Sequence, residues 1–171
     1  ERDIDRAMAT GLPRREQLTA DVQEVIDDPA ISIVCECMGG IQPARDFIVR
    51  ALEAGKTVIT SNKDVVARHW PDFEEAAKKT GAGFYFEATS GGGIPIVNAL
   101  RTATTATDID RLMGIVNGTC NYILTRMSRE DASFEDVLAE AQALRYAEAD
   151  PSSHVDGWDS AYKLAILGSM A

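Results

Sequence analysis

Cysteines are few and long apolar runs are missing, and both shortages narrow the possible classes of protein. No run reaches the ~20 apolar residues that a membrane-spanning helix needs. The cysteines, Cys35, Cys37 and Cys120, are odd in number and show no disulfide framework, so we expect reduced thiols in a cytoplasmic protein. Because Cys35 and Cys37 lie two residues apart in a strand-like run, we expect them to be small core residues rather than metal ligands.

Positive charge and histidine are also scarce. The 17 Lys and Arg residues stand against 27 Asp and Glu, and the net charge of −10 argues against nucleic acid or an acidic membrane as a partner. The two histidines, His69 and His154, fit no metal-ligand spacing. No initiator Met or signal peptide is visible, and the sequence stops while an apolar helical pattern is still running. We therefore expect the chain to be the middle of a longer protein.

The first half of the sequence alternates between strand and helix patterns. Residues 1–17 are charged and irregular, and a short helix is expected at 21–27. Strands are then expected at 31–37, 57–60 and 84–87, with helices at 44–54, 62–67 and 71–80. This order predicts an α/β fold with a parallel sheet, in which ligands bind at the carboxyl ends of the strands.

The second half has a different pattern. Helices are expected at 95–103, 119–126 and 134–144 and from Trp158 to the end, and a strand is expected at 108–116. Three glycines and a proline between Gly91 and Pro95 interrupt every other pattern. We place a domain boundary there, which gives domains of residues 1–92 and 93–171.

The last expected helix carries a pair of opposite charges. Asp159 and Lys163 stand four residues apart and share one face. The apolar residues go round the whole helix, which predicts a buried helix, and charged residues are seldom buried unless they are paired. Glu148 lies upstream, and the turn signals Asp150-Pro151 and Asp156-Gly157 can fold it back towards the helix. These three residues indicate a functional site; the alternative is a solvated ion pair worth ~0.3–0.5 kcal/mol.

Three other segments could carry chemistry. Lys63 opens a helix, where the helix dipole disfavours a cation, so it is either a ligand for an anion or carbonyl or a solvated lysine. Glu87 and the carbonyls of the loop 88–94 could hold a hard cation, or the loop is a plain interdomain turn. Cys120 lies near a helix N-terminus, which lowers a thiol pKa and can produce a nucleophile, although no histidine is an obvious partner.

Five segments together resemble the homoserine dehydrogenase family. They are MGGI at 38–41, VITSNK at 58–63, EATSGGGIP at 87–95, GIVNGTCNYI at 114–123 and YAEADPSSHVDGWDSAYK at 146–163. The last is specific to the family, whereas the glycine runs alone are not. The resemblance implies an α/β fold: the C-terminal part of a Rossmann-type nucleotide-binding domain, followed by the first part of an α/β (α+β) catalytic and dimerisation domain.

The resemblance also implies an activity. The family oxidises L-homoserine reversibly to L-aspartate 4-semialdehyde with NAD or NADP, in the biosynthesis of threonine, methionine and isoleucine. The protein is then expected to be a homodimer or higher homo-oligomer. The first strand–helix–strand unit of the cofactor site would precede this chain, so the chain alone is expected to be inactive, with Arg2 as a weak match to the end of the segment that separates NAD from NADP.

The site residues implied by the resemblance agree with the chemistry. Lys163 is the proton donor and acceptor, with Lys63 beside the cofactor and the substrate. An unperturbed lysine, with a pKa of ~10.4, is a poor base at neutral pH, and burial or a second cation would lower that pKa, whereas a carboxylate would raise it. The resemblance further implies the following: substrate binding by Glu148, Asp159 and Lys63; cofactor binding by Lys63, Gly39 and Gly40; and a sodium-like cation held by Glu87 and the carbonyls of Ser90, Gly92 and Ile94.

Two positions depart from the family pattern, and two other functions are alternatives. Arg145 stands where the family usually has glycine, so its side chain would either obstruct the cofactor or bind an NADP phosphate. His154 replaces a usual acidic residue. The alternatives are a semialdehyde dehydrogenase that acts through Cys120, and a nucleotide-binding regulatory module without turnover.

Overall fold

A computed structural model describes residues 3–11 and 14–171, so Arg2 lies outside the described residues. The chain divides into two compact units, Glu1–Phe86 and Glu87–Ala171. Within the described residues, no helix has both the length and the apolar character that crossing a membrane requires.

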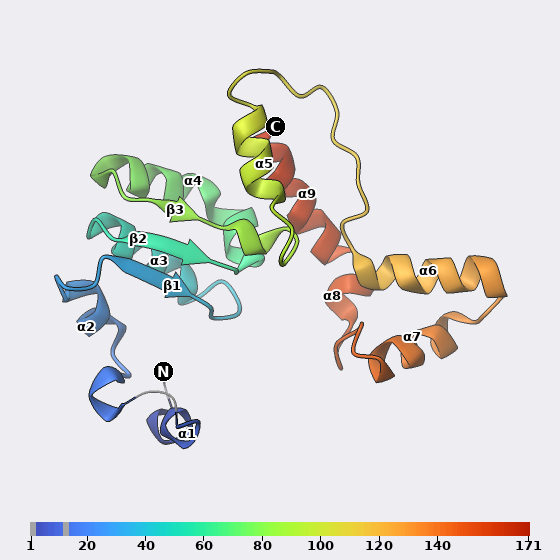
Figure 1. Cartoon of the computed structure of the whole chain (residues 1–171), viewed down its shortest axis with the longest axis horizontal. Helices are drawn as coiled ribbons and strands as arrows, with labels where there is room; N and C mark the ends of the chain where they lie inside the picture. Colours follow the sequence, from blue (N-terminus) through green and yellow to red (C-terminus); the bar gives the residue numbers. More distant parts are fainter. Residues whose placement is uncertain (1–2, 12–13) are drawn as a thin grey trace. The chain divides into compact units, whose positions relative to one another are not determined.

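A small parallel sheet forms the centre of the first unit. The strands β1 (Ile33–Glu36), β2 (Thr57–Thr60) and β3 (Phe84–Tyr85) are hydrogen-bonded in that order, and both pairs are parallel. The helices α3 (Ala44–Glu53) and α4 (Lys63–Thr80) connect them (Figure 1). The predicted α/β class is therefore confirmed, and the strand predicted at 57–60 is confirmed at both ends.

The helices of this unit follow local signals in the sequence. α4 was predicted as two helices and is one helix with a kink at His69, two residues before Pro71, whose ring nitrogen has no hydrogen to donate. The short helix expected at 21–27 is α2 (Val22–Asp27), which is capped by the Asp21 side chain. The prediction that residues 1–17 are irregular was wrong, because α1 (Ile4–Ala9) is capped by Asp3 and a 3-10 turn, η1 (Arg15–Gln17), follows.

Only one face of the sheet is covered by α3 and α4. Val58 and Glu36 point towards the buried face, whereas alternate residues such as Ile33 and Ile59 are exposed. Cys35 pairs with Ile59 in the register and is exposed with it, and Cys37 is also exposed. The prediction that these two cysteines are core residues was therefore wrong, because Cys35 points to the uncovered face and Cys37 is exposed just after the end of β1.

The described part of the second unit is helical. After a 3-10 turn, η2 (Glu87–Thr89), come α5 (Ile96–Ala103), α6 (Gly118–Glu130), α7 (Phe134–Ala143), α8 (Ser152–Val155) and α9 (Trp158–Met170) (Figure 1). Ile123 of α6 and Val137 of α7 are the centre of a buried apolar cluster. α9 packs against α5 and α8. Side chains at the start of α6 donate hydrogen bonds to the carbonyls of Tyr146 and His154, which holds the segment 144–157 beside the beginning of that helix.

Two expectations for this unit were wrong. The segment 108–116 forms no strand, and Met113 and Ile115 within it are exposed, because a strand needs a hydrogen-bonded neighbour and none lies beside it in the described residues. α9 is not buried all round either: Trp158 is 55% exposed and Leu164 58% exposed. Its buried side instead contains Ile166, Leu167 and Asp159.

Candidate active site

The buried face of α9 contains the two charges that the sequence singled out. Asp159 is 1% exposed, and the Lys163 side chain is 16% exposed. Lys163 Nζ donates to Asp159 Oδ2 at 2.8 Å and to the backbone carbonyl of Val116 at 2.7 Å. This pair is not a solvated surface pair, because its charges are largely out of water and each helps to satisfy the other.

Asn117 connects three segments next to this pair. Its side-chain oxygen accepts from the Cys120 amide at 3.0 Å and caps α6, while its Nδ2 donates to the His154 carbonyl at 3.1 Å. Thr119 Oγ1 donates to the Tyr146 carbonyl at 2.7 Å. The sequence reasoning missed Asn117; its place before a helix start was the available signal. Val116 could not be identified in this way, because its carbonyl is reached only through the tertiary fold.

The Cys120 thiol is not activated. Burial, with a smaller contribution from the Asp159 carboxylate, raises its pKa above the ordinary value. Its Sγ donates to the His154 carbonyl at 3.1 Å. The expectation of a lowered pKa at a helix N-terminus was therefore wrong, because desolvation and a nearby negative charge oppose the helix dipole. This removes the physical basis for a thiolate mechanism.

Glu148 lies in a second, polar part of the unit. It lines an open hollow of about 600 Å³ with Arg145 and Gln142, and Gln142 Nε2 donates to the Glu148 carbonyl at 3.2 Å. Arg145 has a φ of 62°, in the left-handed region that favours glycine. The hollow thus combines a carboxylate and a guanidinium, which suits a ligand with both charges.

The first unit has its own candidate residues at the carboxyl ends of the strands. Lys63 is the first residue of α4, and Gly39 and Gly40 follow β1. Asn62 Nδ2 donates to the carbonyls of Met38 at 3.1 Å and Gly40 at 2.7 Å, so it fixes the loop after β1. Asn62 therefore holds the backbone of the expected cofactor ligands Gly39 and Gly40 in place.

A buried carboxylate supports the same loop. Glu36 is 5% exposed, and it accepts from the Met38 amide and from Thr60 Oγ1, both at 2.6 Å. The sequence reasoning did not identify Glu36 as a candidate residue. The signal was a charged residue within a β-branched run, which burial makes costly unless it is hydrogen-bonded.

The expected cation ligands lie around the start of α5. The two carboxylate oxygens of Glu87 accept from the amides of Val97 and Asn98, both at 2.9 Å, so Glu87 caps this helix from a distance in sequence. Ser90 is buried, Gly92 and Ile94 are exposed, and the Ile94 carbonyl accepts from the Ile96 amide. The cation site remains a prediction, and its carboxylate also has a structural role.

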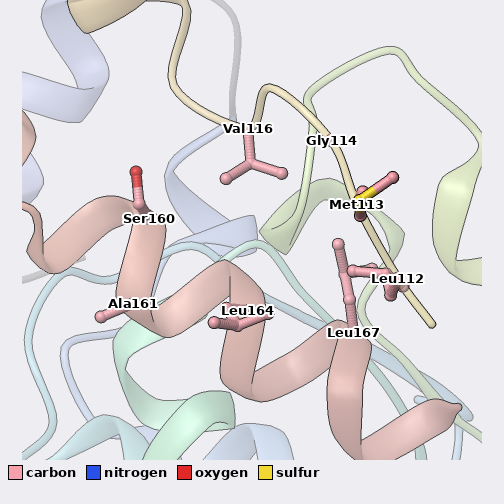
Figure 2. Close-up of a pocket in the computed structure, with 8 residues that line it drawn as sticks. All are labelled: Leu112, Met113, Gly114, Val116, Ser160, Ala161, Leu164 and Leu167. Carbon is pink, nitrogen blue, oxygen red and sulfur yellow. The ribbon is translucent and has the colours of Figure 1, made fainter.

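An apolar hollow of about 410 Å³ lies between α9 and the segment 112–116 (Figure 2). Figure 2 shows Ala161, Leu164 and Leu167 on α9 and Leu112 and Val116 on that segment. None of the candidate charged residues lines it. The hollow does include Val116, whose carbonyl accepts from Lys163 Nζ.

Comparison with protein families gives matches over nearly the whole chain. Residues 2–87 match the family model described as "Homoserine dehydrogenase, NAD binding domain", and residues 95–171 match the one described as "Homoserine dehydrogenase". A homoserine dehydrogenase of Synechocystis is 47% identical over 169 residues, and one of Bacillus subtilis is 44% identical over 169 residues. Each alignment covers 99% of this chain and 39% of the relative, so the chain spans about two fifths of their length.

Solved structures agree with the sequence matches. A homoserine dehydrogenase from Thiobacillus denitrificans is similar with a TM-score of 0.87 and 47% identity, covering 98% of this chain and 38% of that one. A hyperthermophilic archaeal homoserine dehydrogenase in complex with NADPH has a TM-score of 0.82 and 29% identity, over 96% of this chain and 53% of that one. Both units therefore have counterparts in one known family, and the chain belongs to the homoserine dehydrogenase family.

Proposed function

We propose that the complete protein carrying this chain oxidises L-homoserine reversibly to L-aspartate 4-semialdehyde with NADP or NAD, in threonine, methionine and isoleucine biosynthesis, and that Lys163 transfers the proton. The observation that carries this proposal is the position of Lys163. It lies on the buried face of α9, and its Nζ is held by Asp159 and by the Val116 carbonyl. A lysine fixed in this way is oriented before a substrate arrives.

Two of the three N–H directions of the Lys163 ammonium have acceptors in the described residues. The third can point to the oxygen on the reacting carbon of the substrate. In the oxidation direction, neutral Lys163 takes the hydroxyl proton; in the reduction direction, its ammonium donates to the carbonyl oxygen. The nicotinamide, when bound, exchanges the hydride with that carbon. One residue thus serves both directions of the reaction.

Glu148 and Asp159 are proposed to bind the substrate, with the Glu148 carboxylate at its ammonium group. Glu148 lines a hollow beside Arg145. Lys63, Gly39 and Gly40 are proposed to bind the cofactor, with Lys63 also next to the substrate and contributing to catalysis. Support comes from the match of residues 2–87 to an NAD binding domain and from the relative solved with NADPH.

Further parts of the proposal rest mainly on the resemblance. We propose that residues 1–92 belong to the cofactor domain and residues 93–171 to the catalytic domain. A sodium-like cation is proposed at Glu87, Ser90, Gly92 and Ile94. We also propose that the complete protein is a homo-oligomer. A location in the cytoplasm is proposed as well, and the free state of the described cysteines supports it.

The test uses the complete protein with Lys163→Ala. We expect kcat to fall by about 10²–10⁴-fold, the usual range for general acid–base catalysis, with NADPH binding retained. Because Ala leaves a buried carboxylate without its cation, which costs about 3–5 kcal/mol, Lys163→Gln is assayed in parallel. Gln keeps an amide donor for Asp159 and cannot take a proton at neutral pH.

Lys78→Ala is the matched control, since Lys78 forms an i,i+4 pair with Glu74 at 3.1 Å on an exposed face. We expect its kcat to equal that of the unmodified protein. If Lys163→Gln retained more than about a tenth of kcat, the assignment of proton transfer to Lys163 would be wrong. If the complete protein bound NADPH and did not turn over homoserine, the alternative of a regulatory module would be correct.

A further inference from the structure

Two opposite charges line the same hollow without pairing. Arg145 and Glu148 both border the open hollow of about 600 Å³ that follows α7, and both residues are exposed. They stand three residues apart, yet within the described residues neither charged group has a hydrogen bond or an ion pair. A ligand that carries both charges would therefore find a partner for each of them.

The backbone that carries these charges is anchored to the end of α7. The Tyr146 amide donates to the Ala141 carbonyl at 2.8 Å. Gln142 Nε2 donates to the carbonyls of Glu148 at 3.2 Å and of Ala149 at 3.3 Å. The wall of the hollow is thus formed before a ligand arrives, which lowers the entropy cost of binding one.

Arg145 occupies its position at a cost to the backbone. Its φ of 62° lies in the left-handed region, which disfavours every residue with a Cβ and does not disfavour glycine. The dipole of α7 favours a cation near the end of that helix, but a basic residue in the last turn would gain as much without this conformation. A costly backbone conformation at the edge of a candidate ligand site indicates that the side chain has a function.

The charges in the hollow favour a zwitterion over a phosphate. A guanidinium binds a carboxylate and a phosphate with the same planar pair of donors, so Arg145 alone does not distinguish them. The Glu148 carboxylate in the same hollow repels a phosphate, whereas it attracts an ammonium group. An amino acid offers an ammonium group to Glu148 and a carboxylate to Arg145, which leaves no charge unpaired.

We propose that Arg145 binds the α-carboxylate of the substrate while Glu148 binds its ammonium group, so that Arg145 makes the site selective for a free amino acid. This inference rests on the proposed function, in which the substrate is L-homoserine. L-Aspartate 4-semialdehyde has the same two groups, so the contact is equally strong before and after the reaction. Binding of this kind lowers KM and leaves kcat unchanged. Because the family usually has glycine at this position, the contact is an addition in this chain and the chemistry does not depend on it.

The test measures kcat and KM for homoserine oxidation by the complete protein at saturating cofactor. Arg145→Gly removes the guanidinium and suits the left-handed backbone, so the variant is expected to fold. We expect its KM to rise about tenfold, as for the loss of one charge-assisted hydrogen bond, with kcat unchanged. Arg145→Lys keeps the charge without the planar pair of donors and should have an intermediate KM. Arg129→Ala removes an exposed arginine in the last turn of α6 and, as the control, should change neither constant.

Two competitive inhibitors test which group of the substrate Arg145 holds. 3-Aminopropanol has the hydroxyl and the ammonium group of homoserine and lacks the carboxylate, so its Ki should be equal in Arg145→Gly and the unmodified protein. L-α-Aminobutyrate lacks only the hydroxyl, and its Ki should rise about tenfold, like the KM for homoserine. Equal changes in the two Ki values, or an unchanged KM for homoserine in Arg145→Gly, would overturn the proposal.

Titration with NADPH in the absence of substrate tests the cofactor alternative. We expect Arg145→Gly to bind NADPH as tightly as the unmodified protein does. Weaker NADPH binding with an unchanged KM for homoserine would assign the guanidinium to a cofactor phosphate and would refute the carboxylate contact. If the unmodified protein does not oxidise homoserine, it is the proposed function that fails, whereas oxidation with an unchanged KM in Arg145→Gly refutes only the role of Arg145.

Discussion

Arg145→Gly should stabilise the chain. Arg145 follows α7, and the Tyr146 amide donates to the Ala141 carbonyl at 2.8 Å while the Arg145 amide donates to the Gln142 carbonyl at 3.0 Å. This pair of bonds is the Schellman ending of a helix, which places the residue after the cap in the left-handed region, where glycine has no penalty. Arg145 adopts this conformation with a φ of 62°.

The magnitude follows from two opposing terms. For a residue with a Cβ, the left-handed backbone conformation costs about 1–2 kcal/mol of conformational free energy. Glycine has more freedom in the unfolded chain, which costs about 0.4–1 kcal/mol on folding. The midpoints of these ranges give a net gain of about 0.8 kcal/mol, equivalent to roughly 2–3 °C in Tm for a chain of this size. The side chain of Arg145 is exposed, so little packing is lost.

Urea unfolding followed by the fluorescence of Trp158, which lies in the same unit, measures this gain in a Trp70→Phe background. Arg145→Ala removes the long side chain but keeps Cβ, so its stability should not rise. Asp131→Gly is the matched comparison, because Asp131 ends α6 with a φ of 54°. Aspartate tolerates the left-handed region better than arginine does, so the gain in stability should be smaller for Asp131→Gly than for Arg145→Gly. Equal stabilisation by Arg145→Ala and Arg145→Gly would refute the explanation by backbone strain.

Two further outcomes test the local structure. Asn62→Asp keeps the cap of α4 and loses both amide donors to the loop after β1, so we expect a loss of about 1–3 kcal/mol in urea unfolding and weaker NADPH binding by the complete protein; unchanged binding would contradict the supporting role of Asn62. Iodoacetamide treatment of the native chain with mass spectrometry should modify Cys35 and Cys37 at least ~10-fold faster than Cys120, because only the thiolate reacts and burial raises the pKa of Cys120. Preferential labelling of Cys120 would restore the thiolate mechanism as an alternative.

The elements that could be predicted from the sequence are those fixed by local signals. α3 begins at Ala44 and β2 runs from Thr57 to Thr60, as their apolar periodicity indicated. The prediction of a strand at 108–116 was wrong, because an alternating pattern forms a strand only beside a neighbouring strand, and the pattern alone does not show whether there is one. The prediction that Cys35 is a core residue failed for a related reason, since the alternation of a strand gives two faces and does not say which one a helix covers.

The candidate site shows the same division between local and distant contacts. The Asp159–Lys163 pair was predictable because spacing along one helix brings the two side chains together. The other contacts of this pair could not be predicted from the sequence. The Val116 carbonyl and the His154 imidazole reach it only through the fold of the loops before α6 and α9. A lysine becomes a base or remains an ammonium according to these additional contacts. The sequence could therefore locate the lysine for which proton transfer is proposed, whereas the contacts that hold its ammonium group depend on the tertiary fold.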